Sequence, residues 1–134
     1  MALIGSEEWL ESLLENLNAN EVFAEAASDW EGDFTFIITS EGALDHDIYF
    51  YVDLWHGKAR SGRVLKSPEE VESAYTFKGV YSSWLAVMKR ELDPLRGLLA
   101  GKFELQGDMA KVLKRVKAAQ EMVNAIIETD TELY

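Results

Sequence analysis

The chain has 134 residues, 48% of them apolar and 11% aromatic, a composition that fits one globular domain spanning residues 1–134. It contains no cysteine and two histidines, which excludes disulfide scaffolds, thiolate metal centres and cysteine nucleophiles and argues against a multi-histidine metal site. The formal net charge of −11 argues against nucleic acid as a partner, because attraction to phosphate requires a positive surface.

Two helices are predicted at the N-terminal end. Ser6 is a favourable N-cap residue, and two glutamates follow it in the first turn, where they complement the helix dipole. Apolar residues then recur at helical spacing from Trp9 to Leu17. Asn20 is predicted to cap a second, short helix that ends near Ala27.

Three strands are predicted next, over residues 34–39, 48–55 and 58–65. The middle strand alternates an aliphatic face with a second face that carries Tyr49, Tyr51 and Trp55. The third strand is polar and basic, which is typical of an edge strand protected by charge.

The remainder of the chain alternates short strands with helices. We expect a helical turn at 67–70, a strand at 74–77, a helix over 80–92, a short helix over 94–101, a strand at 102–106 and a helix over 109–128. Three consecutive strands followed by isolated strands among helices are typical of an α+β fold with one sheet. We expect the helices to pack on one face of that sheet.

The second half of the chain also carries a recognisable succession of motifs. It contains Ala-Tyr-Thr-Phe at 74–77, Val-Tyr-Ser-Ser-Trp at 80–84, Asp-Pro at 93–94 and Gly-Lys-Phe-Glu-Leu-Gln-Gly-Asp-Met at 101–109. This stretch resembles the sterol carrier protein family, also called the sterol carrier protein type two domain. The last block is similar to the strand-to-helix signature of that family, in which the glycines form turns and Asp108 caps a helix.

The resemblance implies a sterol-carrier-protein-like, five-stranded and mostly antiparallel sheet with helices packed on one face. It also implies an apolar tunnel between sheet and helices that holds a fatty acyl chain, a sterol-like molecule or another elongated apolar ligand. The family has no known catalytic residues, so we expect lipid binding and transport without enzymatic activity and without a cofactor.

Seven side chains on the helices of the second half are expected to line the tunnel. They are Trp84, Met88, Met109, Val112, Leu113, Val116 and Gln120. The alternative for the apolar members is an ordinary core, because a stripe at helical spacing is typical of core packing. The polar Gln120 is expected either to contact a ligand head group or to lie at the edge of the stripe.

No motif in the chain predicts catalysis or metal binding. The sequence Asp45-His46-Asp47 carries metal-ligating types, but three successive residues in a turn do not converge readily on one ion. No Gly-rich phosphate loop, dinucleotide fingerprint or metalloprotease helix occurs.

The charges are unevenly distributed along the chain. Residues 1–57 carry 13 acids and no Lys or Arg, whereas residues 58–117 carry all 13 bases. Eight of these bases gather in the segments 58–66 and 111–117. One interpretation is internal charge balance against the acidic first half, and the other is transient contact with an anionic head group or membrane surface.

The face with Tyr49, Tyr51 and Trp55 is open to a partner or a second copy of the chain unless a helix or the crossover loop covers it. It underlies an alternative function, in which the chain is an accessory or dimerising interaction module of the same fold with a closed cavity. The first five residues lack the features of a signal peptide, and the last three form no peroxisomal or retention address, so we expect a cytoplasmic protein.

Overall fold

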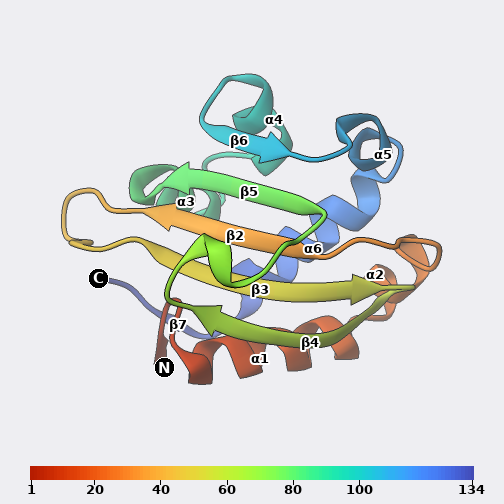
Figure 1. The fold of residues 1–134 in the computed structure, drawn as a ribbon, viewed down its shortest axis with the longest axis horizontal. Helices are drawn as coiled ribbons and strands as arrows, with labels where there is room; N and C mark the ends of the chain where they lie inside the picture. The colour runs from red at the N-terminus through yellow and green to blue at the C-terminus, as the bar shows by residue number, and fades with distance from the viewer.

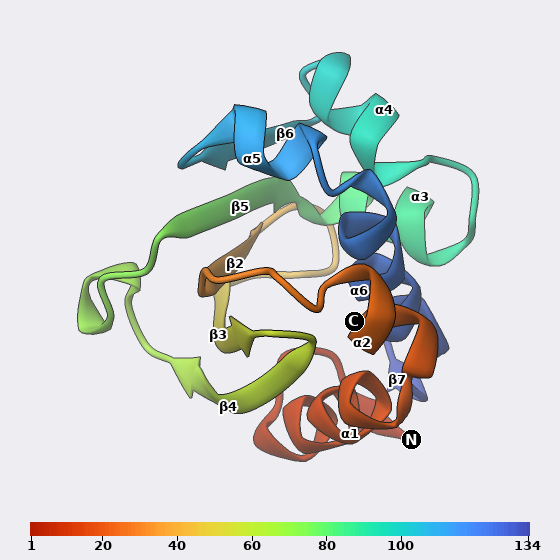
Figure 2. The same ribbon diagram turned by 90° about the vertical axis from the view of Figure 1, so that its right-hand side faces the viewer.

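The computed structural model describes all 134 residues and confirms the α+β class. One sheet has five strands in the order β4-β3-β2-β5-β6. The longer helices lie on one side of this sheet, and the connection from β4 to β5 lies on the other (Figures 1 and 2). No helix combines the length and apolar character needed to cross a bilayer.

The two predicted N-terminal helices are present. Helix α1 spans Glu7–Ala19, and the Ser6 hydroxyl accepts a hydrogen bond from the Trp9 amide at 3.2 Å. Helix α2 spans Glu21–Ala26, and the Asn20 side chain caps it. The apolar stripe of α1 is buried against the sheet edge at β4, so this helix closes one side of the core.

Four strand pairings define the five-stranded sheet. Strands β2 (Phe34–Thr39), β3 (Ile48–Trp55) and β4 (Lys58–Leu65) form an antiparallel meander. Strand β5 (Tyr75–Val80) then pairs parallel to β2, and β6 (Phe103–Gln106) pairs antiparallel to β5. The sheet is therefore mixed but mostly antiparallel, and the basic β4 is an edge strand as predicted.

The alternation within β3 separates the two faces of the sheet. Ile48, Phe50, Val52 and Leu54 are buried on the helix side, whereas the tyrosines and Trp55 point to the other side. The β4–β5 connection crosses this outer face and contains a 3-10 turn, η1, at Pro68–Glu70 (Figure 1).

Two predicted helices differ from the structure. Helix α3 spans Tyr81–Met88 and ends before Leu92, because Arg90 adopts a left-handed backbone (φ 61°). The predicted helix over 109–128 is two helices, α5 (Met109–Leu113) and α6 (Val116–Glu128). The break lies at Arg115, whose backbone is non-helical (φ −128°, ψ 45°) and whose guanidinium pairs with Asp29.

The family-like block at 101–109 folds as its residues suggest. Helix α4 spans Pro94–Leu99, and Gly101 follows it with a positive φ of 78°. After β6, Gly107 turns the chain beside the Tyr75 ring, where an added Cβ would lie 2.5 Å from a ring carbon. Asp108 then caps α5 by accepting from the Lys111 amide.

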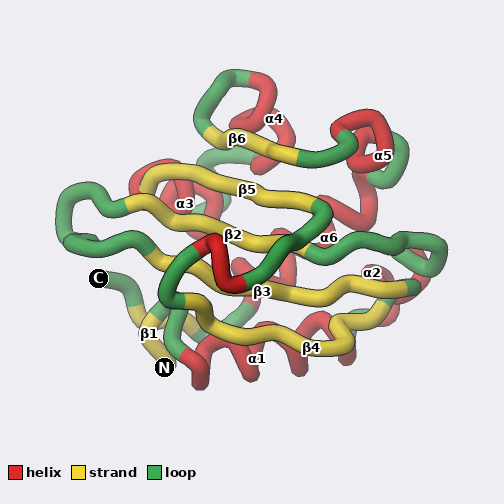
Figure 3. The backbone as a smooth tube through the Cα atoms, viewed as in Figure 1, coloured by secondary structure: helices red, strands yellow, loops and turns green.

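One pair of strands has no counterpart in the prediction. Strands β1 (Ala2–Leu3) and β7 (Thr131–Glu132) pair parallel and bring the two ends of the chain together (Figure 3). The indole NH of Trp9 donates to the Thr131 hydroxyl at 2.9 Å and so connects the β1–β7 pair to α1. Strands of two residues are too short to show an alternating pattern in the sequence.

Candidate functional site

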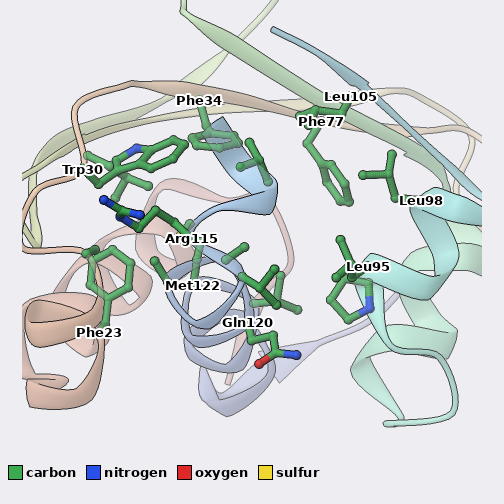
Figure 4. A pocket seen from close by; sticks show the side chains of 18 of the residues that line it. Phe23, Trp30, Phe34, Phe77, Leu95, Leu98, Leu105, Arg115, Gln120 and Met122 are labelled. Carbon is green, nitrogen blue, oxygen red and sulfur yellow. The ribbon is translucent and has the colours of Figure 1, made fainter. Parts of the chain in front are cut away.

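An apolar cavity lies between the inner face of the sheet and helices α2, α4, α5 and α6 (Figure 4). Its cavity volume is about 80 Å³, and it is partly open to solvent. Sixteen of its 19 lining residues are apolar. The complete lining is Phe23, Ala27, Trp30, Phe34, Phe36, Leu54, Phe77, Pro94, Leu95, Leu98, Leu105, Val112, Arg115, Val116, Ala118, Ala119, Gln120, Met122 and Val123.

The sheet and the helices contribute different walls of the cavity. In Figure 4, Phe34, Phe77 and Leu105 come from the strands, and Leu95 and Leu98 face them from α4. Several of the apolar lining residues are only half-buried, namely Phe34, Leu95, Leu98, Leu105, Val116 and Ala119. Apolar side chains at the floor of an open pocket retain such partial exposure, and a bound apolar molecule would cover them.

A close approach between α4 and the sheet fixes one wall. The Phe103 ring of β6 lies against Gly97 of α4, where an added Cβ would come within 2.9 Å of a ring carbon. The same ring lies against Gly79 of β5, at 2.4 Å from the corresponding Cβ position. Helix α4 is therefore held on Phe103, and its Leu95 and Leu98 are directed into the cavity.

Trp30 and Arg115 lie at one end of the cavity (Figure 4), and Asp29, Lys111 and Lys114 adjoin them. The Arg115 guanidinium is paired with the Asp29 carboxylate, with Nε at 2.9 Å from Oδ1. The Lys111 ammonium lies 4.8 Å from the centre of a Trp30 ring and donates to the backbone carbonyl of Glu31. We call Asp29, Trp30, Lys111, Lys114 and Arg115 the basic end.

The ion pair at the basic end shifts the pKa of both partners. The hydrogen bond from Arg115 lowers the pKa of the Asp29 carboxyl below its ordinary value, and Asp29 raises the pKa of the Arg115 guanidinium. Both groups are therefore charged at neutral pH, and the pair joins the segment after α2 to the junction of α5 and α6.

The structure places three of the seven predicted tunnel residues in the cavity lining, namely Val112, Val116 and Gln120. Trp84, Met88, Met109 and Leu113 are not among the lining residues. Trp84 is 1% exposed and donates its indole NH to the Ile37 carbonyl at 3.2 Å. Met88 and Met109 are half-buried, and Leu113 is 45% exposed. The break at Arg115 interrupts the continuous stripe that the sequence suggests, so Met109 and Leu113 of α5 fall outside the lining. Trp84 and Met88 belong to α3, which contributes no lining residue.

Most of the cavity lining was missed by sequence reasoning. Trp30 lies in a loop, and Phe34, Phe77 and Leu105 come from three strands that are separated in sequence. The alternation of Phe34 and Phe36 in β2 and the Leu95/Leu98 spacing in α4 were the available signals. Neither shows which strand face meets which helix.

The outer face of the sheet holds its aromatic residues in polar contacts. The Tyr51 hydroxyl donates to Asp33 at 2.6 Å, and burial together with this contact raises its pKa. The Tyr49 hydroxyl donates to Asp47 at 3.2 Å. Trp55 is 39% exposed and lies under the Arg60 guanidinium at 4.5 Å. Dimerisation through this face stays a prediction.

His46 and His56 are not among the residues that line the cavity. His46 contacts the adjacent Asp45 carboxylate, and His56 contacts Glu31 at 2.6 Å. No group of three or more His, Asp or Glu side chains is arranged to hold a metal ion.

Solved structures show the same fold over nearly the whole chain. A crystal structure of sterol carrier protein 2 is 28% identical and has a TM-score of 0.86, with 95% of this chain and 99% of that chain covered. A solution structure of a conserved hypothetical protein from Thermus thermophilus, described as possibly a sterol carrier protein, is 27% identical, with a TM-score of 0.85 and coverage of 98% of this chain and 93% of that chain.

The fold also occurs within a larger enzyme. A sec-alkylsulfatase variant has a TM-score of 0.54 at 17% identity, and the match covers 83% of this chain but only 16% of that one. A comparison with curated protein sequences finds no match. Residues 6–120 match the SCP-2 sterol transfer family, so the chain belongs to this family, whose members bind and transfer lipids.

Proposed function

We propose that the chain binds one elongated apolar molecule, an acyl chain or a sterol-like lipid, in the cavity between the sheet and α4, α5 and α6. The observation that carries this proposal is the open, almost wholly apolar lining of the cavity. The polar side chains that line it are Arg115 and Gln120, which are suited to the polar end of an amphiphile.

Burial of the ligand supplies enough free energy without any specific polar contact in the interior. Each methylene removed from water contributes about 0.8 kcal/mol. A long acyl chain therefore gains about 10 kcal/mol, from which the cost of immobilising it on the protein is subtracted. The balance favours reversible binding, which a carrier requires in order to release its cargo.

We propose a carrier without a catalytic step. Neither Arg115 nor Gln120 is a nucleophile paired with a general base, and the rest of the lining is apolar. The role of such a cavity is to exclude water from the ligand while it is carried.

The first experiment identifies what the protein carries. The full chain is purified without detergent, extracted into organic solvent and analysed by mass spectrometry. A stoichiometric lipid in the extract is the expected result. The stripped protein is then titrated with a fluorescent fatty acid, and absence of binding at micromolar concentration would overturn the proposal.

A matched pair of variants locates the binding site. Ala119 lines the cavity and is half-buried, so Ala119→Trp places an indole in the ligand space and is expected to weaken binding more than tenfold. Ala43 is exposed in the β2–β3 loop and lies outside the lining, so Ala43→Trp is expected to leave binding unchanged. Equal affinities for the two variants would contradict binding in this cavity.

A second candidate is an accessory module of the same fold. Its support is the sulfatase, in which the matched region forms 16% of the chain. That alternative requires a cavity filled by side chains, whereas Leu95, Leu98 and Leu105 are only half-buried here and leave apolar surface open to a ligand. A folded protein with no extractable lipid and no ligand uptake would favour the module over the carrier.

A further inference from the structure

Helix α4 lies over the sheet with one aromatic ring between them. The Phe103 ring lies against Gly79, its partner across the β5–β6 pairing, and against Gly97 of α4. A Cβ added at Gly97 would lie 2.9 Å from a ring carbon, a separation that real Cβ atoms do not show. The helix therefore sits as near to the sheet as a single ring permits.

The two glycines serve this contact and not a special backbone conformation. Neither Gly79 nor Gly97 is among the glycines with a positive φ. Gly79 lies within β5 and Gly97 within α4, where glycine weakens a strand or a helix relative to other residues. Glycine inside a regular element marks the close approach of another group, and here that group is the Phe103 ring.

Buried neighbours hold the Phe103 ring in one orientation. The ring stacks on Phe77, with 4.7 Å between ring centres and 16° between the planes. Trp84 lies nearly perpendicular to it at 5.3 Å. The Lys102 amide donates to the Gly97 carbonyl at 2.7 Å and connects the end of α4 to the start of β6. The spacing between α4 and the sheet is thus set by a ring that cannot tilt without displacing close-packed side chains.

This spacing sets the width of the cavity. Leu95 and Leu98 extend from α4, and Phe77 and Leu105 lie opposite them on the sheet (Figure 4). The cavity volume of about 80 Å³ is roughly half of the ~150 Å³ of an engineered apolar cavity that binds benzene. A longer ligand must therefore displace lining side chains as it enters.

Acyl chains and sterols place different demands on this narrow gap. An acyl chain is thin and rotates about each of its bonds, so it enters as flexible side chains such as Leu98 and Met122 change rotamer one at a time. A fused sterol ring system is rigid and wide, so it requires α4 to move away from the sheet as a whole. That movement separates Gly97 from Phe103 and forfeits the dispersion energy of their contact.

We propose that Phe103, seated between Gly79 and Gly97, is a positioning residue that determines ligand specificity and selects an unbranched acyl chain over a sterol. This inference rests on the proposed lipid-binding function and narrows its ligand class. Phe103 is not among the lining residues. It acts by holding Leu95 and Leu98 of α4 at a fixed distance from the sheet.

The first test compares neutral ligands that differ in the shape of their hydrocarbon. Hexadecanol, its methyl-branched analogue phytanol and cholesterol each carry one hydroxyl, and each displaces a fluorescent fatty acid from the stripped full-length protein. Hexadecanol is expected to bind about tenfold more tightly than cholesterol, with phytanol between them. Cholesterol binding as tight as hexadecanol binding, or tighter, would overturn the selectivity and leave the carrier intact. Failure of every ligand to bind, the fluorescent fatty acid included, would overturn the carrier.

The second test changes the spacing itself. The methyl group of Gly97→Ala pushes α4 away from Phe103 and is expected to raise the affinity for cholesterol relative to hexadecanol about fivefold. Adding Phe103→Leu to Gly97→Ala makes room for the methyl group and is expected to return this ratio to within about twofold of its original value. The control Leu99→Ala shortens a side chain of α4 that is 76% exposed and outside the lining, and it is expected to leave the ratio unchanged.

The affinity ratio separates spacing from stability, because a general loss of stability weakens both ligands together. A ratio that Gly97→Ala leaves unchanged, or that Leu99→Ala alters equally, would overturn the role of Phe103. A ratio that stays raised in the double variant would overturn it too. Should Gly97→Ala not fold, Leu98→Ala widens the same gap from the helix side and is expected to raise the ratio. An unchanged ratio in that variant would overturn selection by width.

Discussion

The α1 side and the α4 side of the same sheet bury their apolar residues to different extents. Beside β4 and β3, the side chains of Leu13, Leu17 and Phe50 are completely buried. Beside β5 and β6, Leu98 and Leu105 are half-buried and face a cavity. We call the first region the packed half and the second the open half.

Two short helices contribute to the difference, because they cover the open half together with the longer α6. Helix α1 has 13 residues and an apolar stripe long enough to cover its part of the sheet. Helices α4 and α5 have six and five residues, and α4 meets the sheet where Gly97 lies against Phe103. Short helices leave apolar strand residues without a partner, and a ligand can then complete the core. The cavity is thus the place where the helix layer does not fully cover the sheet.

The largest expected effect is on the stability of the packed half. Leu13→Ala leaves a void among fully buried side chains and is expected to lower the free energy of unfolding by about 3–4 kcal/mol. Leu98→Ala enlarges a space that is already open and is expected to cost only about 1 kcal/mol. Urea denaturation of both variants without ligand measures the difference, and equal losses would remove the distinction between the two halves.

Ligand binding is expected to stabilise the protein through the open half. A ligand at about 100 times its dissociation constant raises the free energy of unfolding by about 2.7 kcal/mol. Leu13→Ala is expected to keep this increment although its starting stability is lower, and Ala119→Trp is expected to lose it. Urea midpoints with and without a fluorescent fatty acid test both variants. An increment retained by Ala119→Trp would place the ligand elsewhere.

Placing a tryptophan in each half is expected to give a smaller difference in the free energy of unfolding. Ala125 is 1% exposed within the core, so Ala125→Trp overpacks it and is expected to destabilise the protein by about 1–3 kcal/mol. Ala119→Trp enters the cavity and is expected to cost less than about 1 kcal/mol without ligand. Thermal unfolding of the stripped proteins provides the comparison. A greater cost at Ala119 would mean that the cavity has no room for an indole.

The packed half was largely predictable from the sequence. Ser6 and the stripe from Trp9 to Leu17 predict α1 because cap and periodicity are local signals. The alternation in β3 likewise predicts which of its residues are buried. Both features depend on residues a few positions apart.

The open half was predictable only in part. The family-like block predicted β6, its flanking turns and the Asp108 cap. The break between α5 and α6 was not predicted, because Arg115 pairs with an aspartate 86 positions earlier in the chain. The cavity lining draws on loops, strands and helices whose mutual placement has no periodic signature, so Val112, Val116 and Gln120 were predicted and Trp30 was missed.

The smallest expected effect concerns the Asp29–Arg115 ion pair at the junction of α5 and α6. Arg115 holds the pKa of Asp29 below its ordinary value, so the folded state binds the Asp29 proton more weakly than the unfolded state does. The contribution of the pair to stability is therefore fully present above the unfolded pKa of about 3.9 and is lost as the pH falls through the folded pKa. Asp29→Asn is expected to remove this part of the pH dependence.

Urea midpoints of the stripped protein, measured from about pH 6 down to about pH 3, test this expectation. The unmodified protein should lose slightly more stability on acidification than Asp29→Asn, and the difference should be small because Asp29 and Arg115 are partly exposed. Glu25→Gln, which neutralises an exposed carboxylate on α2 that forms no ion pair, should follow the unmodified protein. If Asp29→Asn and Glu25→Gln respond identically to acidification, the ion pair does not stabilise the junction of α5 and α6.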